Sequence, residues 1–323
     1  MATARLKTTA LGETGMHITR VGFGAWAIGG GGWEFGWGPQ DDDDSVAAIH
    51  RALELGVNWI DTAAAYGFGH SEEIVGRALE EVPNDERPYV FTKASLVEGP
   101  ARTVVHNLKR DSILREAYAS LERLGVDAID LYQVHWPIPD SDLEEGWAAF
   151  AELKNRGVVR HIGVSNFSIE QLRRAQQIAP VATLQPQYSL VVRDAEAELL
   201  PFAERERIGV IVYSPMGSGL LTGALTRERI ANFPADDWRK QDARFQEPRL
   251  SQNLALVERL RAVADGYNVS IGAVAVAWTL RNPAVDAAIV GFRRPDQVDS
   301  IIGAADLELD DDDLATIELR KAA

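Results

Sequence analysis

Short apolar runs alternate with helical patterns along most of the chain, and this alternation constrains the fold more than any other feature. The runs are apolar on both faces, which is typical of buried parallel strands. After each run, apolar residues recur at helical spacing, as Val46, Ile49 and Leu53 do. We count eight such strand–helix units, the number that a (β/α)8 TIM barrel of the α/β class requires. The predicted strands are residues 21–24, 57–61, 88–93, 129–135, 159–166, 182–187, 209–215 and 287–292.

The whole chain, residues 1–323, is predicted to form a single barrel domain, because no linker, repeat or low-complexity segment divides it. The stretch 6–20 predicts an N-terminal β-hairpin that turns at Glu13–Gly15 and covers one barrel end. Residues 310–320 predict a final surface helix. Ser71 is a good candidate to start the helix that follows the second strand. The remaining helices are expected near 44–55, 114–124, 143–153, 169–175, 195–206, 253–264, 271–280 and 295–302.

The charge balance and the absence of cysteine exclude several classes of protein. The chain has 33 basic and 48 acidic residues, a net charge of −15, which disfavours nucleic acid and anionic membranes as partners. It contains no cysteine, so disulfides and thiol catalysis are excluded. No run of 18 apolar residues and no signal-peptide pattern is found. We therefore expect a cytoplasmic enzyme without a membrane partner. The sequence leaves open whether the enzyme forms a homo-oligomer.

Other polar motifs in the chain have ordinary structural interpretations. The six histidines show no ligand-spaced pair, so no metal site is expected. His70, His106 and His161 are predicted to be exposed. The glycine-rich segment 29–38 lacks the lysine of a phosphate-binding loop and predicts a flexible loop over the barrel mouth. The aspartate runs at 41–44 and 310–313 are expected to cap helices.

Four chemically active side chains lie at or just after predicted strand ends. Asp61, Lys93 and His135 end the second, third and fourth strands, and Tyr66 follows the second. Active sites of such barrels lie at the C-terminal strand ends, so these side chains should meet. A nearby ammonium lowers the pKa of a phenol, so Lys93 is predicted to lower that of Tyr66. Asp61 would neutralise the buried lysine, and His135 would orient a substrate carbonyl.

This set of groups suits the reduction of a carbonyl. A tyrosine alone, or a histidine alone, is more often structural, and it is the combination that indicates chemistry. No side chain delivers hydride, so the reaction requires a nicotinamide cofactor.

The order of segments resembles the aldo-keto reductases over nearly the whole chain. The stretch GVNWIDTAAAYGFGHSEEIVGRAL is similar to the first signature of that family. The later segments LYQVHWP, IGVSNFS, LQPQYSLVVRD, VIVYSPMGSGLLTG and IVGFRRPDQV follow in the family's order. The chain resembles bacterial and channel-β-subunit-like members more than the aldose reductases, in its YSPMGSGLLTG loop and in the short segment after His135.

The resemblance implies a role for each matching residue. Tyr66 would be the general acid, with Asp61, Lys93 and His135 as its partners. Ser165, Asn166 and Gln185 would bind the carboxamide of the nicotinamide, and Tyr213 would stack on its ring. The resemblance places the rest of the NADPH site at Gly24, Ala25, Trp26, Asp61, Ser214, Pro215, Met216, Gly217, Ser218, Gly219, Leu220, Leu221, Gly291, Arg293 and Gln297.

The substrate is expected to be a small carbonyl compound in an aromatic pocket. Its wall is predicted to contain the aromatic and catalytic side chains Trp26, Phe35, Trp37, Tyr66, His135 and Trp136. The segment Thr226–Arg249 is expected to be a mobile loop that closes over the cofactor or the substrate. Ile301 stands where many relatives carry Asn or Glu against the adenine, which leaves the adenine contacts open.

Three hypotheses for function follow. The favoured one is an NADPH-dependent reductase of aldehydes and ketones. The alternative is a non-catalytic NADPH-binding regulatory subunit, against which the intact four-residue set argues. An isomerase of phosphorylated sugars would leave the segments IGVSNFS and YSPMGSGLL unexplained.

Overall fold

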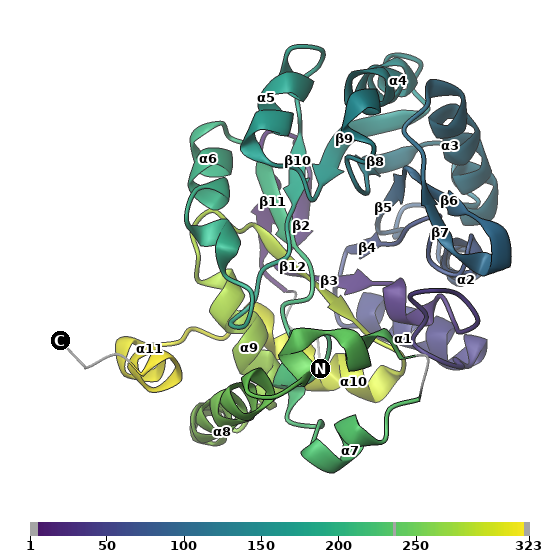
Figure 1. Cartoon of the computed structure of the whole chain (residues 1–323). Coiled ribbons are helices and arrows are strands. Elements are labelled where there is room, and N and C mark those ends of the chain that lie inside the picture. The colour runs from purple at the N-terminus through teal and green to yellow at the C-terminus, as the bar shows by residue number, and fades with distance from the viewer. Residues whose placement is uncertain (1–5, 235–236, 320–323) are drawn as a thin grey trace.

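The computed structural model describes residues 6–234 and 237–319 of the chain. Eight parallel strands close into a barrel, with each strand paired to the next in chain order and the last paired to the first. Figure 1 shows this ring of strands at the centre, with helices around its outside. The predicted (β/α)8 fold is therefore confirmed. The barrel strands are β3 (Val21–Gly24), β4 (Trp59–Asp61), β5 (Tyr89–Ala94), β8 (Ile129–Val134), β9 (Val159–Ser165), β10 (Thr183–Gln185), β11 (Gly209–Val212) and β12 (Ala287–Gly291).

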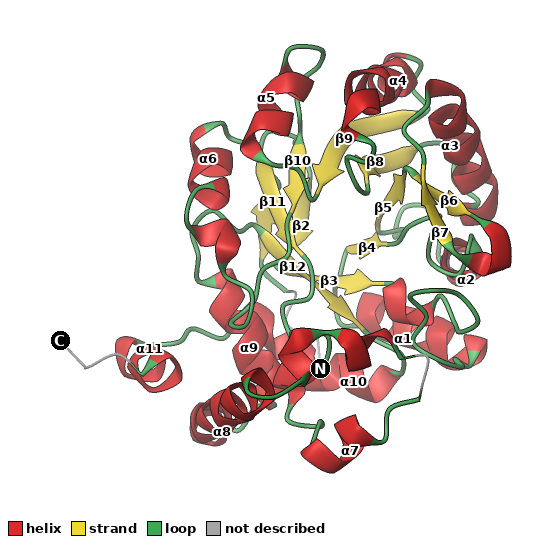
Figure 2. Ribbon diagram, in the orientation of Figure 1, coloured by secondary structure: helices red, strands yellow, loops and turns green. Residues whose placement is uncertain are grey.

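The helices surround the barrel, as the colouring by secondary structure in Figure 2 makes clear. They bury apolar side chains against the outer faces of the strands in one continuous core. The α-helices are α1 (Asp42–Glu54), α2 (His70–Glu80), α3 (Arg110–Leu124), α4 (Leu143–Asn155), α5 (Ile169–Gln176), α6 (Leu199–Arg205), α7 (Arg227–Ala231), α8 (Arg249–Tyr267), α9 (Ile271–Leu280), α10 (Pro295–Ile301) and α11 (Asp311–Glu318). The short 3-10 helices are η1 (Trp26–Ile28), η2 (Pro100–Arg102), η3 (Asp140–Asp142), η4 (Asp194–Glu196), η5 (Leu220–Thr222), η6 (Trp238–Gln241), η7 (Ala243–Phe245) and η8 (Ile302–Ala305).

The two aspartate runs cap helices as the sequence indicates, whereas the cap expected at Ser71 is not found. Asp41 accepts the backbone N–H groups of Asp43 and Asp44 at the start of α1. Asp310 forms a capping box at the start of α11. The assignment of Ser71 as a helix cap is wrong, because α2 begins one residue earlier and its N-cap is Gly69. Burial turns the Ser71 hydroxyl inward, where it donates to the Ala25 carbonyl oxygen at 2.8 Å.

The N-terminal hairpin closes one end of the barrel. Strands β1 (Thr8–Ala10) and β2 (His17–Thr19) pair antiparallel, as predicted. The hairpin contributes Leu11, Met16 and Ile18 to a buried cluster with side chains from inside the barrel. In that cluster the indole of Trp59 fills the space over Gly22, where any Cβ would collide with the ring. The N-terminal ends of the strands are thus plugged by apolar side chains.

Two folded segments were missed or misjudged from the sequence. A second hairpin, β6 (Leu96–Glu98) with β7 (Val104–His106), lies between β5 and α3. The segment Thr226–Arg249 was expected to be a loop, but it contains α7, η6 and η7. Its side chains Ile230, Phe233 and Phe245 pack with Leu220, Leu225 and Leu250 in a separate apolar cluster.

The C-terminal helix is observed, and α11 buries Ile317 against the molecule. Arg320, the last residue of its predicted range, lies outside the described residues. Within residues 6–234 and 237–319, no helix combines the length and the apolar character needed to span a membrane.

Candidate active site

The structure brings the four predicted side chains together at the C-terminal strand ends. Lys93 Nζ donates to Asp61 Oδ1 and, at 2.9 Å, to the backbone oxygen of Thr62. The same nitrogen lies 3.3 Å from Tyr66 Oη. The rings of Tyr66 and His135 meet edge to face with their centroids 5.6 Å apart. Lys93 is 1% exposed, so it is not a surface lysine.

Strand pairing explains why these groups converge. Asp61 ends β4, beside Gly24 at the end of β3, and Lys93 pairs with Gln133 of β8. The N–H of Ala25 donates to the Asp61 backbone oxygen at 2.9 Å, which ties the start of η1 to β4. Tyr66 sits in the turn before α2, where its N–H donates to Ala63 O at 3.0 Å.

Two glutamine amides hold the second oxygen of Asp61. Gln133 Nε2 donates to Asp61 Oδ2 at 3.2 Å, and Gln185 Nε2 donates to the same oxygen at 2.9 Å. Gln185 Nε2 also donates to Gln133 Oε1 at 3.1 Å. The Gln185 amide nitrogen, expected to face the nicotinamide, is therefore directed at Asp61. Gln133 was not predicted, although its position two residues before His135 on an inward-facing strand was a usable signal.

The pKa of Tyr66 differs from the expectation. Burial raises the pKa of Tyr66 well above its ordinary value, and the Asp61 carboxylate raises it further. The prediction of a lowered Tyr66 pKa is therefore wrong in its net direction, because burial and the Asp61 charge outweigh the contact with Lys93 Nζ at 3.3 Å. Burial lowers the pKa of Lys93, and Asp61 opposes that effect. Tyr66 is accordingly a protonated phenol at neutral pH.

His135 is a neutral imidazole in this environment. Burial lowers its pKa well below the ordinary value, and the Lys93 ammonium and His106 lower it further. Its Nδ1 is buried and has no hydrogen-bond partner within the described part of the chain. A neutral imidazole can donate one N–H to an oxygen without adding charge.

Three further predicted residues form a connected polar network beside this centre. Ser165 Oγ donates to the Gln185 backbone oxygen at 2.8 Å. Asn166 Nδ2 donates to the His135 backbone oxygen at 3.0 Å, and Tyr213 Oη donates to Asn166 Oδ1 at 2.8 Å. Burial raises the pKa of Tyr213, so its hydroxyl stays protonated and can donate.

The segment Ser214–Leu221 fits a phosphate-bearing group. Ser214, Gly217, Ser218 and Gly219 all have left-handed backbone conformations, with φ of 54°, 57°, 57° and 89°. The N–H groups of Ser218 and Gly219 donate to no acceptor within residues 6–234 and 237–319. Successive free N–H groups in such a turn form a concave anion site. The remaining residues of the segment, Pro215, Met216, Leu220 and Leu221, support it by packing, and Leu220 and Leu221 are fully buried.

Arg293 is held against the glycine-rich segment. Its guanidinium donates to Gln40 Oε1 and to the Pro39 backbone oxygen, both uncharged acceptors. Burial lowers its pKa, and the neighbouring charges of Arg294 and Arg239 lower it further. The guanidinium forms no ion pair with any carboxylate in the described parts of the chain, which leaves a concentration of positive charge.

The residues around Arg293 differ in what they offer a ligand. The side chain of Gln297 accepts the Arg293 N–H at 2.7 Å and so shapes the turn. A Cβ on Gly291 would meet no atom closer than 3.9 Å, so open space lies beside it. Ile301 is buried at the end of α10, where Cδ1 faces Gly272 of α9.

An aromatic wall stands over Tyr66. Trp26 stacks near Tyr66 with centroids 6.3 Å apart, and Trp37 packs edge-on against Trp26 at 5.3 Å. Trp238 of η6 stacks on Trp26 at 5.6 Å, an addition from the segment that was expected to be a plain loop. Phe35 and Trp136 are 39% and 38% exposed, and the Phe35 backbone oxygen accepts the Trp26 Nε1–H at 3.1 Å.

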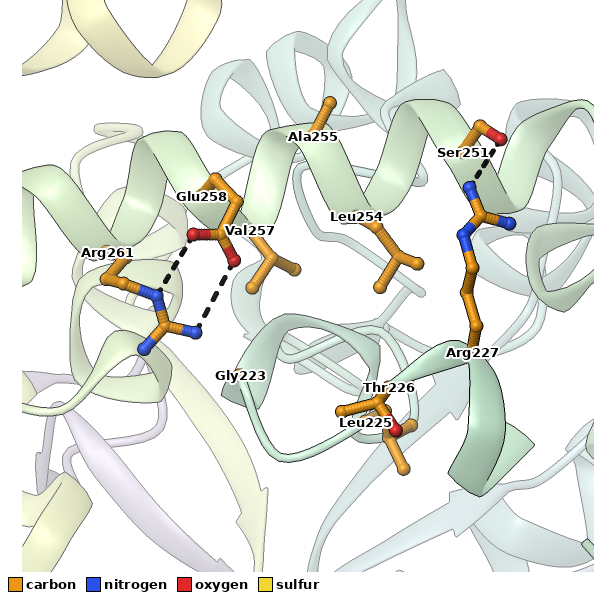
Figure 3. A pocket seen from close by; sticks show the side chains of 10 residues that line it. All are labelled: Gly223, Leu225, Thr226, Arg227, Ser251, Leu254, Ala255, Val257, Glu258 and Arg261. Carbon is orange, nitrogen blue, oxygen red and sulfur yellow. Dashed lines mark hydrogen bonds and ion pairs between the residues drawn. The ribbon is translucent and has the colours of Figure 1, made fainter. Parts of the chain in front are cut away.

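Two surface cavities lie apart from this centre. One, of about 420 Å³, lies between α8 and the loop Gly223–Arg227, where Figure 3 shows Arg227 bonded to Ser251 and Arg261 to Glu258. The other, of about 450 Å³, is lined by glycines of the segment 29–31, with His70 and Arg102. Neither is lined by Tyr66 or Lys93.

The remaining histidines are less exposed than predicted. His70, His106 and His161 are all half-buried, and His70 contacts Asp42 at 3.0 Å. Among residues 6–234 and 237–319, no group of three His, Cys, Asp or Glu side chains could hold a metal ion.

The fold and this centre together define a (β/α)8 barrel with a tyrosine–lysine–aspartate cluster at its C-terminal strand ends. The sequence profile of the Aldo/keto reductase family matches residues 20–320. The chain therefore belongs to the aldo/keto reductase family. Members of this family are oxidoreductases that act on carbonyl and alcohol groups and use nicotinamide cofactors.

Individual relatives cover nearly the full length of the chain. Aldo-keto reductase YhdN of Bacillus subtilis is 40% identical over 92% of this chain and 88% of its own length. The NADH-specific methylglyoxal reductase of Escherichia coli is 35% identical over 95% of this chain and 96% of its own. The solved glycerol dehydrogenase AKR11B4 of Gluconobacter oxydans superposes with a TM-score of 0.87 and 38% identity, covering 99% and 95% of the two chains.

Proposed function

We propose that this protein is an NADPH-dependent reductase of small aldehydes and ketones. The observation that carries the proposal is the contact of Tyr66 Oη with Lys93 Nζ at 3.3 Å. Burial keeps the Tyr66 phenol protonated. A protonated phenol beside a buried ammonium is suited to give up its proton to a substrate oxygen, because the ammonium then stabilises the phenolate that remains. In the cell we place the enzyme in the cytoplasm.

Proton and hydride arrive at opposite ends of the carbonyl bond. The nicotinamide, when bound, supplies the hydride to the carbonyl carbon. Tyr66 transfers its proton to the carbonyl oxygen, which gives the alcohol and leaves the phenolate next to Lys93. His135, neutral because of its lowered pKa, donates an N–H to the same oxygen and fixes its direction. Asp61 holds Lys93 in place and is itself held by Gln133 and Gln185.

The sign of the Tyr66 pKa shift sets the pH dependence of the two directions. Because the pKa is raised, the phenol stays protonated through neutral pH, and the proton donor needed for reduction is fully present. Oxidation requires the phenolate, so its rate is expected to rise with pH across the alkaline range. Reduction is therefore the favoured chemistry near pH 7.

The cofactor is assigned to the polar groups beyond the catalytic centre. Asn166 and Ser165 lie where they can meet a carboxamide, with Tyr213 available to stack on the ring. The free N–H groups of Ser218 and Gly219 suit the pyrophosphate. Arg293, a half-buried cation with only uncharged acceptors, suits the 2′-phosphate that distinguishes NADPH from NADH.

The aromatic wall defines the substrate side. Trp26 stacks near the phenol, Trp37 packs on Trp26, and Trp136 directly follows His135, so a substrate carbonyl would meet aromatic rings. The Arg239 guanidinium lies over the Trp37 ring at 4.7 Å, but it is paired with Asp237 at 2.6 Å and so is not free for a substrate carboxylate. We expect small uncharged aldehydes and ketones to be accepted better than keto acids.

The test is a turnover assay with purified protein, NADPH or NADH, and a panel of aldehydes, followed by loss of nicotinamide absorbance. We expect consumption of NADPH that depends on the aldehyde. A non-catalytic regulatory subunit would instead bind the cofactor, detected by quenching of tryptophan fluorescence, and turn over none of the panel.

Cofactor preference is tested by Arg293→Ala. A charge-assisted hydrogen bond contributes about 1.5 to 3 kcal/mol, and about 1.4 kcal/mol is tenfold in affinity. We expect the variant to lose on the order of tenfold in NADPH affinity and little in NADH affinity. Arg207→Ala, at an exposed arginine paired with Glu13, is the matched control. Equal loss for both cofactors would show that Arg293 only supports residues 37–40.

A further inference from the structure

Ser95 has a backbone conformation that serine rarely adopts. It follows β5, two residues after Lys93, with φ of 88°, and it is fully buried. A non-glycine residue in this region is strained and persists only where neighbouring groups impose the conformation. The contacts of Ser95 therefore indicate what the strain holds in place.

The Ser95 side chain forms two hydrogen bonds with the backbone of Trp136, the residue directly after His135. Its hydroxyl donates to the Trp136 backbone oxygen at 3.1 Å and accepts the Trp136 N–H at 3.2 Å. One residue back, the His135 N–H donates to the Ala94 oxygen at 2.9 Å. The end of β5 is thus tied to the segment that carries the imidazole and the exposed indole.

A half-buried carboxyl group from α3 holds Ser95 from the other side. Glu116 Oε2 accepts the Ser95 N–H at 3.1 Å, and Glu116 Oε1 accepts the hydroxyl of Ser112 at 3.0 Å. The Asn107 N–H donates to the Ser95 oxygen at 2.9 Å, so both polar backbone groups of Ser95 are bonded. Glu116 forms no ion pair in the described parts of the chain.

We propose that Glu116 is a positioning residue for the reaction: through Ser95 it fixes the backbone of His135 and Trp136 at the catalytic centre. This inference rests on the proposed function, because the proposed function places His135 and Trp136 beside the substrate. Glu116 itself touches neither substrate nor cofactor.

The surroundings of Glu116 make this support sensitive to pH. Burial raises its pKa to about 8, and the Glu72 carboxylate of α2 raises it as well, while Arg115 opposes them. Glu72 is itself bonded to Arg123 and Thr92, and Tyr132 of β8 also faces the cluster. Below pH 8 the neutral carboxyl accepts the Ser95 N–H without charge. Above it the carboxylate accepts the hydrogen bonds of Ser95 and Ser112 more strongly, but repulsion from the Glu72 carboxylate is expected to shift it, and Ser95 with it, away from the position held below pH 8.

The first experiment compares reductase pH profiles of the wild type, Glu116→Gln and Glu116→Leu. The wild-type kcat should fall through one proton step near pH 8, which Tyr66 cannot produce because its pKa lies well above its ordinary value of 10.0. Glu116→Gln keeps an acceptor for Ser95 and cannot ionise, so its profile should be flat there. Glu116→Leu removes the acceptor and should lose roughly 10- to 100-fold in kcat at pH 7, since small misplacements at a reacting centre cost this much.

Asp130→Asn is the matched control. Asp130 of β8 is a partly buried carboxyl whose Oδ2 accepts the Val90 N–H at 2.8 Å. Val90 lies in β5, at the end of that strand opposite to Ser95. Burial raises the pKa of Asp130 too. This variant should keep the wild-type pH profile, because its carboxyl supports the closed end of the barrel.

A second readout is independent of turnover. Hydrogen exchange of the peptide around residues 134–137 reports the Trp136 N–H that Ser95 accepts. Protection should be lost in Glu116→Leu and Ser95→Ala, kept in Glu116→Gln, and weakened in the wild type above pH 8. Unchanged protection in Glu116→Leu overturns the proposal, and so does lost protection with an unchanged kcat. If the wild type turns over no carbonyl, the proposed function fails, and exchange still decides whether Glu116 holds the segment.

The pH dependence of the free energy of unfolding gives a further test of the Glu116 pKa shift. The folded pKa of Glu116, about 8, lies above the ordinary 4.5, so its contribution is fully present below pH 4.5 and is lost as pH rises to 8. Urea midpoints of Glu116→Gln and wild type should agree near pH 4.5, and the variant should be the more stable above pH 8. Parallel curves over this window would contradict a half-buried, titrating Glu116.

Discussion

The two ends of the barrel differ in what they bury. At the closed end, Leu11, Met16 and Ile18 of the hairpin pack on apolar side chains such as Trp59 and Phe91. At the open end the buried side chains are Asp61, Lys93, Gln133 and Gln185, joined by hydrogen bonds. Apolar burial stabilises a fold, whereas buried charges and strained backbone cost free energy. The comparison suggests that stability is concentrated at one end and chemistry at the other.

The largest expected effect is on catalysis at the open end. Tyr66→Phe removes the proton donor and keeps the ring, and general acid assistance contributes roughly 10² to 10⁴ in rate. We expect kcat to fall by this factor, measured with saturating NADPH, while cofactor binding by fluorescence is retained. Tyr132→Phe is the control, since Tyr132 Oη is buried without a hydrogen-bond partner in the described residues. A normal kcat in Tyr66→Phe would remove Tyr66 from the mechanism.

Lys93→Met tests whether the open end also carries a stability cost. The change leaves Asp61 buried without its cation, and breaking such a pair destabilises by about 3 to 5 kcal/mol. We expect loss of activity together with this loss in the free energy of unfolding, measured in urea.

The double variant Asp61→Asn/Lys93→Met separates the two effects. Because it removes both charges, much of the stability should return, while activity stays lost. Activity that returned with stability would mean that the ion pair serves the fold alone.

At the closed end, Leu11→Ala should do the reverse. Leu11 is fully buried, and truncation of such a leucine costs about 2 to 5 kcal/mol. We expect a lower urea midpoint and an unchanged kcat at temperatures where the variant is folded. A kcat that fell in proportion to stability would show that the two ends are coupled rather than separate.

Thr14→Ala gives the smallest effect and refines the same contrast. Thr14 Oγ1 donates to the Leu11 oxygen at 2.7 Å and accepts the Met16 N–H at 3.1 Å in the hairpin turn. Loss of these bonds should cost about 0.5 to 1.5 kcal/mol. Thermal unfolding measures the loss, and kcat is expected to stay at the wild-type value. A change in KM would indicate that the hairpin reaches beyond the closed end.

The fold was predictable because its strands are buried on both faces. Such strands form continuous apolar runs, which separate clearly from the amphipathic helices between them. The β6–β7 hairpin was missed because its strands are three residues long and partly exposed, which leaves no periodic signal. The folding of Thr226–Arg249 was missed because its apolar residues are scattered among charges and meet only in three dimensions.

The convergence of the candidate site residues was predictable, and their electrostatics less so. Asp61, Lys93 and His135 were recognised because a barrel directs strand ends to one mouth. The direction of the Tyr66 pKa shift depends on burial, which the sequence does not specify residue by residue. Glu116 lies among charged neighbours in LREAYASLER and looks like a surface helix residue there. Only the packing of α3 on β5 reveals that it is half-buried and directed at Ser95.

The sharing of one Asp61 oxygen by two glutamines also bears on how the sequence can change over time. Gln133 and Gln185 donate to the same acceptor, and Gln185 also donates to Gln133, so a substitution at one changes the effect of a substitution at the other. Contacting residues of this kind show non-additive effects of about 0.5 to 3 kcal/mol. A change tolerated at position 133 in one relative can therefore be rejected in another that differs at position 185. The order in which substitutions at these two positions occur during evolution, and not the amino acid alone, therefore decides which replacements this barrel accepts.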